Sequence, residues 1–242
     1  MHRPTSNLPN ARPPTGELDN AMIRRTLHCV AIAITSILAA ATLSAQNLVA
    51  PTQTKGAKDA EVWTGLVVAQ HDGSTDFNNE FWMAGVRFGR VLTVPHGSGR
   101  LRGTLQWDFD LIPLFVVSNL QSAYGVESDP IVGRWNFERK GRVASYFEMA
   151  GGMAFTKTKI PPGDTSKINF VPSIGYGWQL FRNGHRSIDL GVHAWHLSNA
   201  WTAPDNPSAN GIQITVGYHW YGVKTQRTAS DANENEPVSS AK

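Results

Sequence analysis

Apolar and polar side chains alternate along most of the chain after residue 60. Residues 61–222 divide into eight runs of this kind, each bounded by turn-forming residues. In one of the clearest runs the even positions are Ile212, Ile214, Val216, Tyr218 and Trp220, and the odd positions are Gln213, Thr215, Gly217 and His219. A period of two places the two sets on opposite faces of a β-strand. The sequence therefore predicts an all-β fold whose sheet has one apolar and one polar face.

The connections between the runs favour a membrane barrel over a soluble sandwich. Long connections (71–79, 117–129, 157–166 and 199–210) alternate with shorter ones (93–98, 138–142 and 182–185). Transmembrane barrels carry short turns at one end and long loops at the other. The even number of runs agrees, as do aromatic residues near strand ends, namely Trp178, Trp220 and Tyr221. We expect an eight-stranded antiparallel transmembrane β-barrel over 61–222, and a soluble periplasmic β-sandwich is the alternative that alternation alone does not exclude.

Charged residues on the polar face are expected to fill the barrel. A barrel of eight strands has an interior just wide enough for side chains. The candidates for luminal ion pairs are Arg87, Arg102 and Arg134 with Asp108, Glu138, Glu148 and Asp189. The sequence thus predicts a filled lumen and not a pore.

The N-terminal region has the features of an export signal. Arg24 and Arg25 precede an apolar run over 29–43, which ends in the small residues Ser44 and Ala45. The run is shorter than the ~20 residues that a membrane-spanning helix needs. We therefore expect an upstream extension at 1–21, a cleaved signal peptide at 22–45, a linker at 46–60, a disordered polar tail at 223–242, and localisation in the cell outer membrane.

Composition excludes several kinds of chemistry. The net charge is +3, and no dense cluster of lysine and arginine suggests nucleic-acid binding. The single cysteine, Cys29, lies in the signal peptide, so the mature chain would have no thiol nucleophile. We find no histidine spacing typical of a metal site and expect no cofactor.

The segment from His196 to Asn199 can carry chemistry. His196 and Ser198 share one face of a strand at a Cα spacing of ~6.6 Å, twice the rise per residue. That face is the apolar one, where polar side chains are costly in contact with lipid. A histidine that removes the proton of a serine is the minimum for nucleophilic acyl transfer. The pair is therefore a candidate catalytic site on the lipid-facing wall.

These residues resemble a known family of outer-membrane enzymes. The motif His196-Leu197-Ser198-Asn199-Ala200, with Asn206 in the next loop, is similar to that of the lipid A 3-O-deacylase (PagL-like) family. The resemblance implies an esterase that removes the acyl chain at the 3 position of lipid A with a Ser–His–Glu triad facing the bilayer. It also implies that Ser198 is the nucleophile, His196 the general base, and Asn199 and Asn206 the support of the oxyanion. Lipid A, or lipopolysaccharide, in the outer leaflet would be the partner, and a homodimer is compatible with the sequence.

The chain departs from the family at the third member of the triad. The family has glutamate twelve residues after the serine, where this chain has Asn210; Asp205 is a substitute within the same loop. Asparagine can orient an imidazole but cannot stabilise its positive charge. The alternatives are therefore a non-catalytic structural or adhesive barrel and an acyltransferase of the same architecture. For the acyl chain of a substrate, the sequence suggests a path along Leu190, Val192, Ile214 and Val216.

Overall fold

The computed structural model describes residues 51–69, 80–118, 123–139, 141–183 and 185–222. All of them belong to one compact unit, which spans Ala45–Lys242. The proposed extension, the signal peptide, residues 46–50 of the linker and the C-terminal tail lie outside the described residues. Within the described part of the chain, no helix has the length and apolarity needed to cross a membrane.

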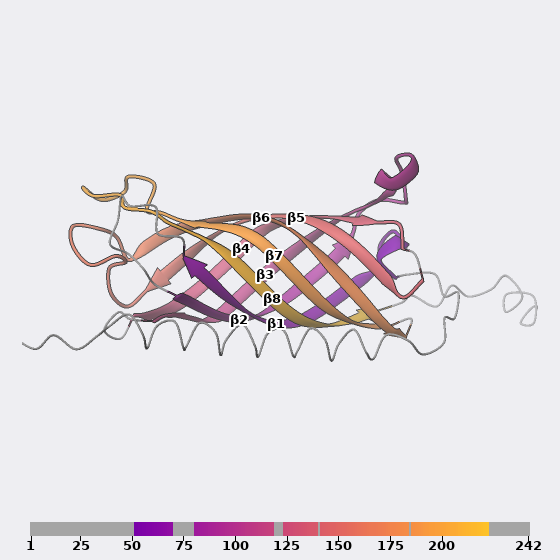
Figure 1. Cartoon of the computed structure of the whole chain (residues 1–242), viewed down its shortest axis with the longest axis horizontal. Helices are drawn as coiled ribbons and strands as arrows, with labels where there is room; N and C mark the ends of the chain where they lie inside the picture. The colour runs from indigo at the N-terminus through magenta and orange to yellow at the C-terminus, as the bar shows by residue number, and fades with distance from the viewer. Residues whose placement is uncertain (1–50, 70–79, 119–122, 140, 184, 223–242) are drawn as a thin grey trace, which may run out of the picture. The chain divides into compact units, whose positions relative to one another are not determined.

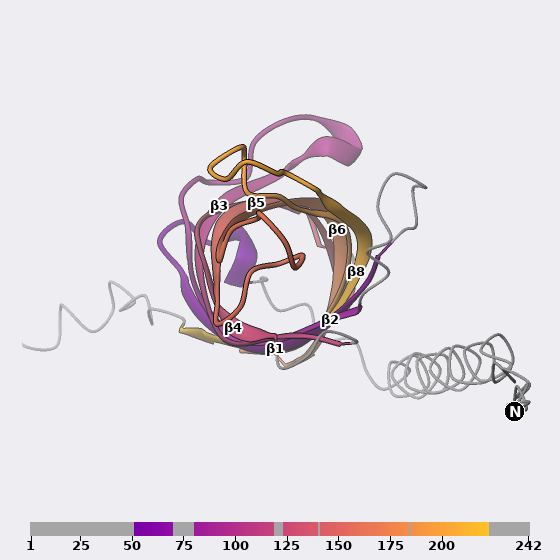
Figure 2. The same ribbon diagram turned by 90° about the vertical axis from the view of Figure 1, so that its left-hand side faces the viewer.

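Eight antiparallel strands form a closed barrel, as the alternation predicts (Figure 1). The strands are β1 (Lys58–Ala69), β2 (Glu80–Val91), β3 (Gly103–Val117), β4 (Tyr124–Phe137), β5 (Val143–Thr156), β6 (Ile168–Asn183), β7 (Arg186–Leu197) and β8 (Ala209–Gly222), with 3₁₀ helices η2 (Pro51–Gln53) and η3 (Gly99–Leu101). Each strand pairs with its neighbour in the sequence, and β1 pairs with β8 to close the ring (Figure 2). The expected fold class is therefore confirmed.

Some boundaries differ from the expectation. β1 begins at Lys58, so the end of the predicted linker belongs to the barrel. The residues before it also contact the wall, because the buried Thr52 accepts a hydrogen bond from Thr104 Oγ1 (2.5 Å) and Gln53 donates one to the carbonyl of Phe137 (3.1 Å). The β2–β3 connection includes η3 and is longer than predicted, whereas β3 and β4 extend into the predicted 117–129 connection. Loop length therefore alternates less strictly than the sequence suggests.

The two faces of the sheet have opposite polarity, and the apolar face is outside. Large exposed apolar side chains cover the outer wall; examples are Trp82 (48%), Ile131 (69%) and Val216 (40%). The buried residues include charged side chains from six of the strands. An apolar exterior around a polar interior is the inverse of a soluble protein and is the arrangement of a transmembrane barrel. The sandwich alternative is therefore wrong.

Layers of side chains fill the lumen. At the end that carries the β7–β8 connection lies an apolar cluster that includes Phe81, Phe115, Trp195 and Leu197. Ile160, from the β5–β6 connection, is fully buried in the same cluster, and Figure 2 shows this connection folded across the opening. The opposite end has a smaller cluster of Ala144, Phe181 and Tyr221. The expectation of a filled interior is thus confirmed.

A charged network lies between these two clusters. Arg87 forms two hydrogen bonds with Asp110 (2.6 Å each) and also contacts Glu148 (2.8 Å). The fully buried Arg134 lies 2.7 Å from Glu148 and 3.5 Å from Asp189. Most of the predicted luminal charges, Arg87, Arg134, Asp108, Glu148 and Asp189, are therefore confirmed.

Two assignments to the lumen were wrong, and one residue predicted near a strand end, Tyr221, lies inside the barrel. Arg102 and Glu138 lie at the surface and pair with each other at 3.5 Å, because both belong to connections beyond the strand ends. Tyr221 is buried inside the barrel, where its hydroxyl contacts Gln179 (2.9 Å). It shares the parity of the luminal His219, so it is not part of an outer aromatic belt.

Candidate active site

His196 and Ser198 lie on the outer wall at one end of the barrel. In β7 the odd residues point inward, including His193, Trp195 and Leu197, so the even residues point outward. Ser198 directly follows β7 and is held by two backbone hydrogen bonds to Phe170 of the neighbouring chain segment (2.7 and 3.1 Å). Behind the pair, the ring of Trp195 packs 4.7 Å from that of Phe81. His196 thus lies on the outer face, as the alternation predicts. The packed rings of Trp195 and Phe81 support the wall behind it.

Asn210 is the direct partner of the histidine. It lies opposite His196 in the β7–β8 register. Its Oδ1 atom is 2.7 Å from His196 Nδ1. An amide oxygen can only accept, so this contact requires the proton of the ring on Nδ1 and leaves Nε2 free to act as a base. The side chain of Asn210 therefore selects the tautomer that a general base needs.

Asp205 forms no ion pair with the histidine among the described residues. Its backbone N–H donates to the carbonyl of Asp164 (3.1 Å), and its own carbonyl accepts from Asn199 Nδ2 (2.7 Å). The carboxylate of Asp205 belongs to an exposed residue and forms no ion pair with His196 within the described part of the chain. The contact with His196 is therefore made by Asn210 and not by the acidic substitute.

Asn199 and Asn206 shape the loop that follows the serine. Asn199 is almost fully buried (1% exposed), and its backbone N–H donates to Asn206 Oδ1 (3.0 Å). The carbonyl of Asn199 accepts from both the backbone N–H (3.1 Å) and the hydroxyl (2.7 Å) of Thr202. These bonds tie both ends of the loop together next to Ser198. Both asparagines therefore hold the loop in place.

A strained turn follows the serine, which the sequence did not predict. Ala200 and Trp201 both have positive φ (51° and 62°), and the hydrogen bond from Thr202 to Asn199 closes the turn. This is a type I′ turn, which normally carries Asn-Gly or Gly-Gly at these two positions. Neither residue gives a turn signal, so only the tertiary contacts of Asn199 reveal it. The backbone N–H groups of Ala200 and Trp201 have no hydrogen-bond partner among the described residues.

An apolar groove runs beside the pair on the outer wall. Its volume is about 470 Å³. Its lining comes from β5 to β8: Met149, Ala150, Pro172, Ser173, Ile174, Ala194, Trp195, His196, Asn210, Gly211 and Ile212. The small residues Ala150, Ser173, Ala194 and Gly211 leave room for the groove, and the larger lining residues border it. The groove lies mainly on the β5–β6 side of His196, so it does not follow the path along Leu190 and Val216 suggested by the sequence.

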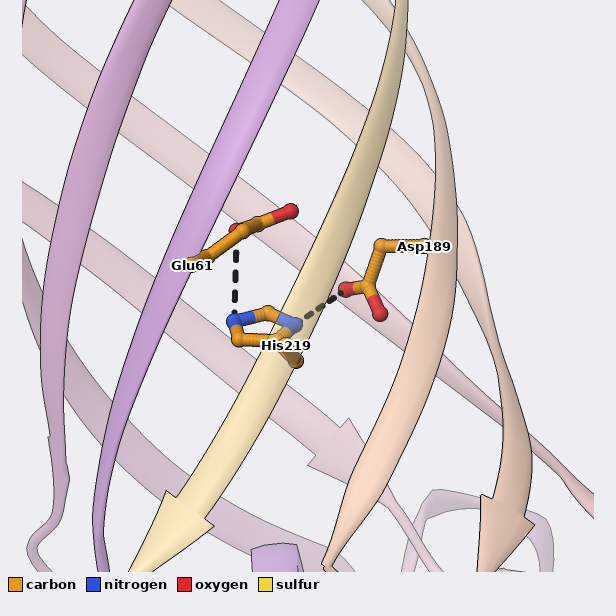
Figure 3. Close-up of side chains that lie close together, drawn as sticks. All are labelled: Glu61, Asp189 and His219. Carbon is orange, nitrogen blue, oxygen red and sulfur yellow. Dashed lines mark ion pairs between the residues drawn. The ribbon is translucent and has the colours of Figure 1, made fainter.

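Inside the barrel, His219 is enclosed by carboxylates (Figure 3). Its Nδ1 is 3.0 Å from Asp189, and its Nε2 is 3.2 Å from Glu61 and 3.0 Å from Asp59. Glu61, Asp189 and His219 are a candidate set of metal ligands. However, Figure 3 shows Glu61 and Asp189 at different ring nitrogens, whereas the ligands of one metal ion converge on it at about 2.0–2.2 Å. The geometry is that of a histidine that forms ion pairs with carboxylates of the luminal network.

These features define a class of protein: a transmembrane β-barrel whose lipid-facing wall carries a half-buried histidine, fixed by Asn210, and a half-buried serine two residues further along the chain. The family model of lipid A 3-O-deacylase (PagL) matches residues 82–219, which is more than half of the chain and includes every candidate site residue. The chain therefore belongs to the lipid A 3-O-deacylase family. Membership makes it an ester hydrolase of the outer membrane, the membrane that contains lipid A.

Several solved structures are similar to the chain. The crystal structure of the outer membrane enzyme PagL is 15% identical, with a TM-score of 0.49, and the match covers 65% of this chain and 97% of that chain. OprG from Pseudomonas aeruginosa is 8% identical (TM-score 0.44; 72% and 100% covered), and Ail of Yersinia pestis is 13% identical (TM-score 0.44; 70% and 100% covered). No curated protein sequence is significantly similar to the chain. At these identities and TM-scores the likeness adds nothing to the assignment, which rests on the family model.

Proposed function

We propose that the chain removes the ester-linked acyl chain at the 3 position of lipid A, with Ser198 as nucleophile and His196 as general base. The observation that carries the proposal is the contact of His196 with Asn210 on the apolar outer wall, beside a groove of about 470 Å³ and two residues before Ser198 in the chain. A soluble substrate would not reach a site in contact with lipid. An acyl chain of a membrane lipid fits the groove, because apolar side chains line most of it.

The reaction needs no cofactor. Ser198 Oγ attacks the carbonyl carbon of the ester while His196 Nε2 takes its proton. The tetrahedral intermediate expels the sugar alkoxide, which takes that proton from the ring and leaves an acyl-serine. Water, deprotonated by the same nitrogen, then attacks the acyl-serine, and the fatty acid is released as Ser198 recovers its proton.

The loop after Ser198 supports the oxyanion of the intermediate. The N–H group of Asn199 is not available, because it already donates to Asn206. The N–H groups of Ala200 and Trp201 in the strained turn are better candidates, since neither has a hydrogen-bond partner among the described residues. One such donor contributes about 3–4 kcal/mol to the stability of a transition state. In this proposal Asn199 and Asn206 hold the loop, and the positive φ of Ala200 and Trp201 turns their N–H groups toward the oxyanion.

Asn210 supports the proposal in one respect and weakens it in another. Its oxygen fixes the ring tautomer, as a triad acid does. It lacks the charge that would stabilise the imidazolium formed when the serine loses its proton. The same observation favours a second candidate function, a non-catalytic structural or adhesive barrel. The proposal expects a working enzyme with a slower acylation step than a glutamate would give.

Mass spectrometry of lipid A tests the proposal. Cells that express the chain should lose one ester-linked acyl chain from lipid A, and cells that express Ser198→Ala should not. The folded state of the variant is checked by the heat-dependent shift in gel mobility that barrels show. Identical acyl patterns in expressing cells, variant cells and cells without the protein would exclude hydrolysis and leave the structural barrel. Transfer of the acyl chain to another lipid, without free fatty acid, would indicate an acyltransferase.

A further inference from the structure

The end of the barrel opposite to Ser198 is strongly basic. Nine cations among the described residues belong to the strand ends and turns there: Lys55, Lys58, Arg90, Arg100, Arg102, Arg139, Arg142, Arg182 and Arg186. Among the described residues of this end, Glu138 is the one exposed acidic residue, and it pairs with Arg102. Such an excess of one sign on a rim attracts anions.

Strand register brings three of these cations onto one part of the outer wall. Lys58 of β1 and Arg90 of β2 are direct cross-strand partners, and both are exposed. Arg186 of β7 is exposed two strands away from Lys58, on the other side of β8. Like charges directly opposite each other destabilise a sheet. No carboxylate within the described part of the chain forms an ion pair with Lys58, Arg90 or Arg186, so nothing in the barrel offsets that repulsion.

Aromatic side chains border the same three cations. Trp107 is the cross-strand partner of Arg90, and Trp220 is the partner of Arg186. Phe88 lies two residues before Arg90, on the same face of β2. All three are exposed on the outer wall, at 45%, 41% and 54% respectively. Aromatic rings gather at the boundary between the hydrocarbon and the headgroups, and cations beyond them reach the headgroup phosphates.

We propose that a basic patch, formed by Lys58, Arg90 and Arg186 and bordered by Phe88, Trp107 and Trp220, binds an anionic phospholipid through its phosphate. A phosphate between Lys58 and Arg90 removes their repulsion, and the guanidinium of Arg90 can bind two of its oxygens. The acyl chains of that lipid lie along Phe88 and Val62, which are both exposed on neighbouring strands. The patch is at the end away from the candidate active site, so under the proposed function its lipid belongs to the leaflet that does not hold lipid A. Phosphatidylglycerol is the probe of choice, because it carries one net negative charge on its phosphate.

Competition between two lipids tests the patch directly. The full barrel is placed in micelles with equal amounts of phosphatidylglycerol and phosphatidylcholine, and bound lipid is read by native mass spectrometry. Each cation near an anionic surface strengthens binding by about fivefold. We expect the unaltered barrel to retain phosphatidylglycerol preferentially and the double variant Lys58→Gln/Arg90→Gln to lose about 25-fold of that preference. The variant Lys58→Arg should keep it.

A matched control removes two cations from the opposite rim. Lys159→Gln/Lys167→Gln lowers the net charge equally and should leave the lipid preference unchanged. Equal retention of both lipids by the unaltered barrel, or equal loss in both double variants, would overturn the proposal. If the double variant does not fold, the salt dependence of the unaltered barrel decides: the preference must fall as ionic strength rises. Deacylase activity is not the readout, so failure here is distinct from failure of the proposed function.

Discussion

Asn210 Oδ1 lies 2.7 Å from His196 Nδ1, across the pair of strands β7 and β8. The contact gives the histidine a fixed orientation and tautomer but no neighbouring negative charge. Catalysis by the pair therefore depends on geometry more than on charge stabilisation.

Restoring a carboxylate at this position should accelerate the reaction. In Asn210→Glu or Asn210→Asp, the carboxylate would stabilise the imidazolium that forms as Ser198 loses its proton. We expect kcat to rise by roughly 10²-fold or more, because the loss of a triad acid costs ~10⁴-fold in serine proteases. Initial rates of fatty-acid release from lipid A in detergent measure the effect.

The controls separate orientation from charge. Asn210→Leu removes both functions and should reduce kcat below that of the unaltered chain. Asp205→Asn should have no effect, since its carboxylate forms no ion pair with His196 within the described part of the chain. If neither Asn210→Glu nor Asn210→Leu changes kcat, Asn210 takes no part in catalysis.

The buried amide of Asn199 should control the loop after Ser198. Asn199→Ala removes the donor to the carbonyl of Asp205 and leaves that group without its bond. Such a loss costs about 1–3 kcal/mol, which is enough to release the strained turn at Ala200 and Trp201. We expect a lower kcat and faster proteolysis at this loop, with little change in the unfolding of the barrel. Thr93→Ala, which breaks a loop hydrogen bond at the other end, is the control and should leave kcat unchanged.

Filling the groove should affect long acyl chains selectively. Ala194 is a small residue in the lining, and Ala194→Phe would occupy part of the 470 Å³. We expect a higher KM for substrates with long chains and a smaller change for short ones. Val216→Phe, on the other side of His196, tests the path suggested by the sequence and should leave KM unchanged. A higher KM in Val216→Phe but not in Ala194→Phe would show that the acyl chain binds on the Val216 side of His196.

The buried Arg134 should be essential for stability. It is fully buried between Glu148, Asp189 and Asp108, so Arg134→Ala leaves several carboxylates without their cation. Breaking a buried ion pair by removing one partner costs about 3–5 kcal/mol. Arg102→Ala, which breaks the exposed pair with Glu138, should cost less than about 1 kcal/mol. Urea unfolding in lipid vesicles, followed by tryptophan fluorescence, compares the two. Equal losses would contradict the assignment of Arg134 to the luminal network.

The alternation along the chain was enough to predict eight strands, the polarity of their two faces and the outward position of His196, although several strand boundaries differ. These follow from a period of two, which depends on neighbouring residues alone and is therefore readable along the chain. The family motif likewise lies within a short segment.

Tertiary contacts set the partner of the histidine, the turn of the loop and the position of the groove. Asn210 reaches His196 through the register of two strands, whereas Asp205 contacts the loop through its backbone. The turn at Ala200 and Trp201 is held by the side chains of Asn199 and Thr202, against the local preference of both residues. Strand register and loop hydrogen bonds join residues that are distant in sequence, so their outcome is fixed by the closed barrel and not by local pattern.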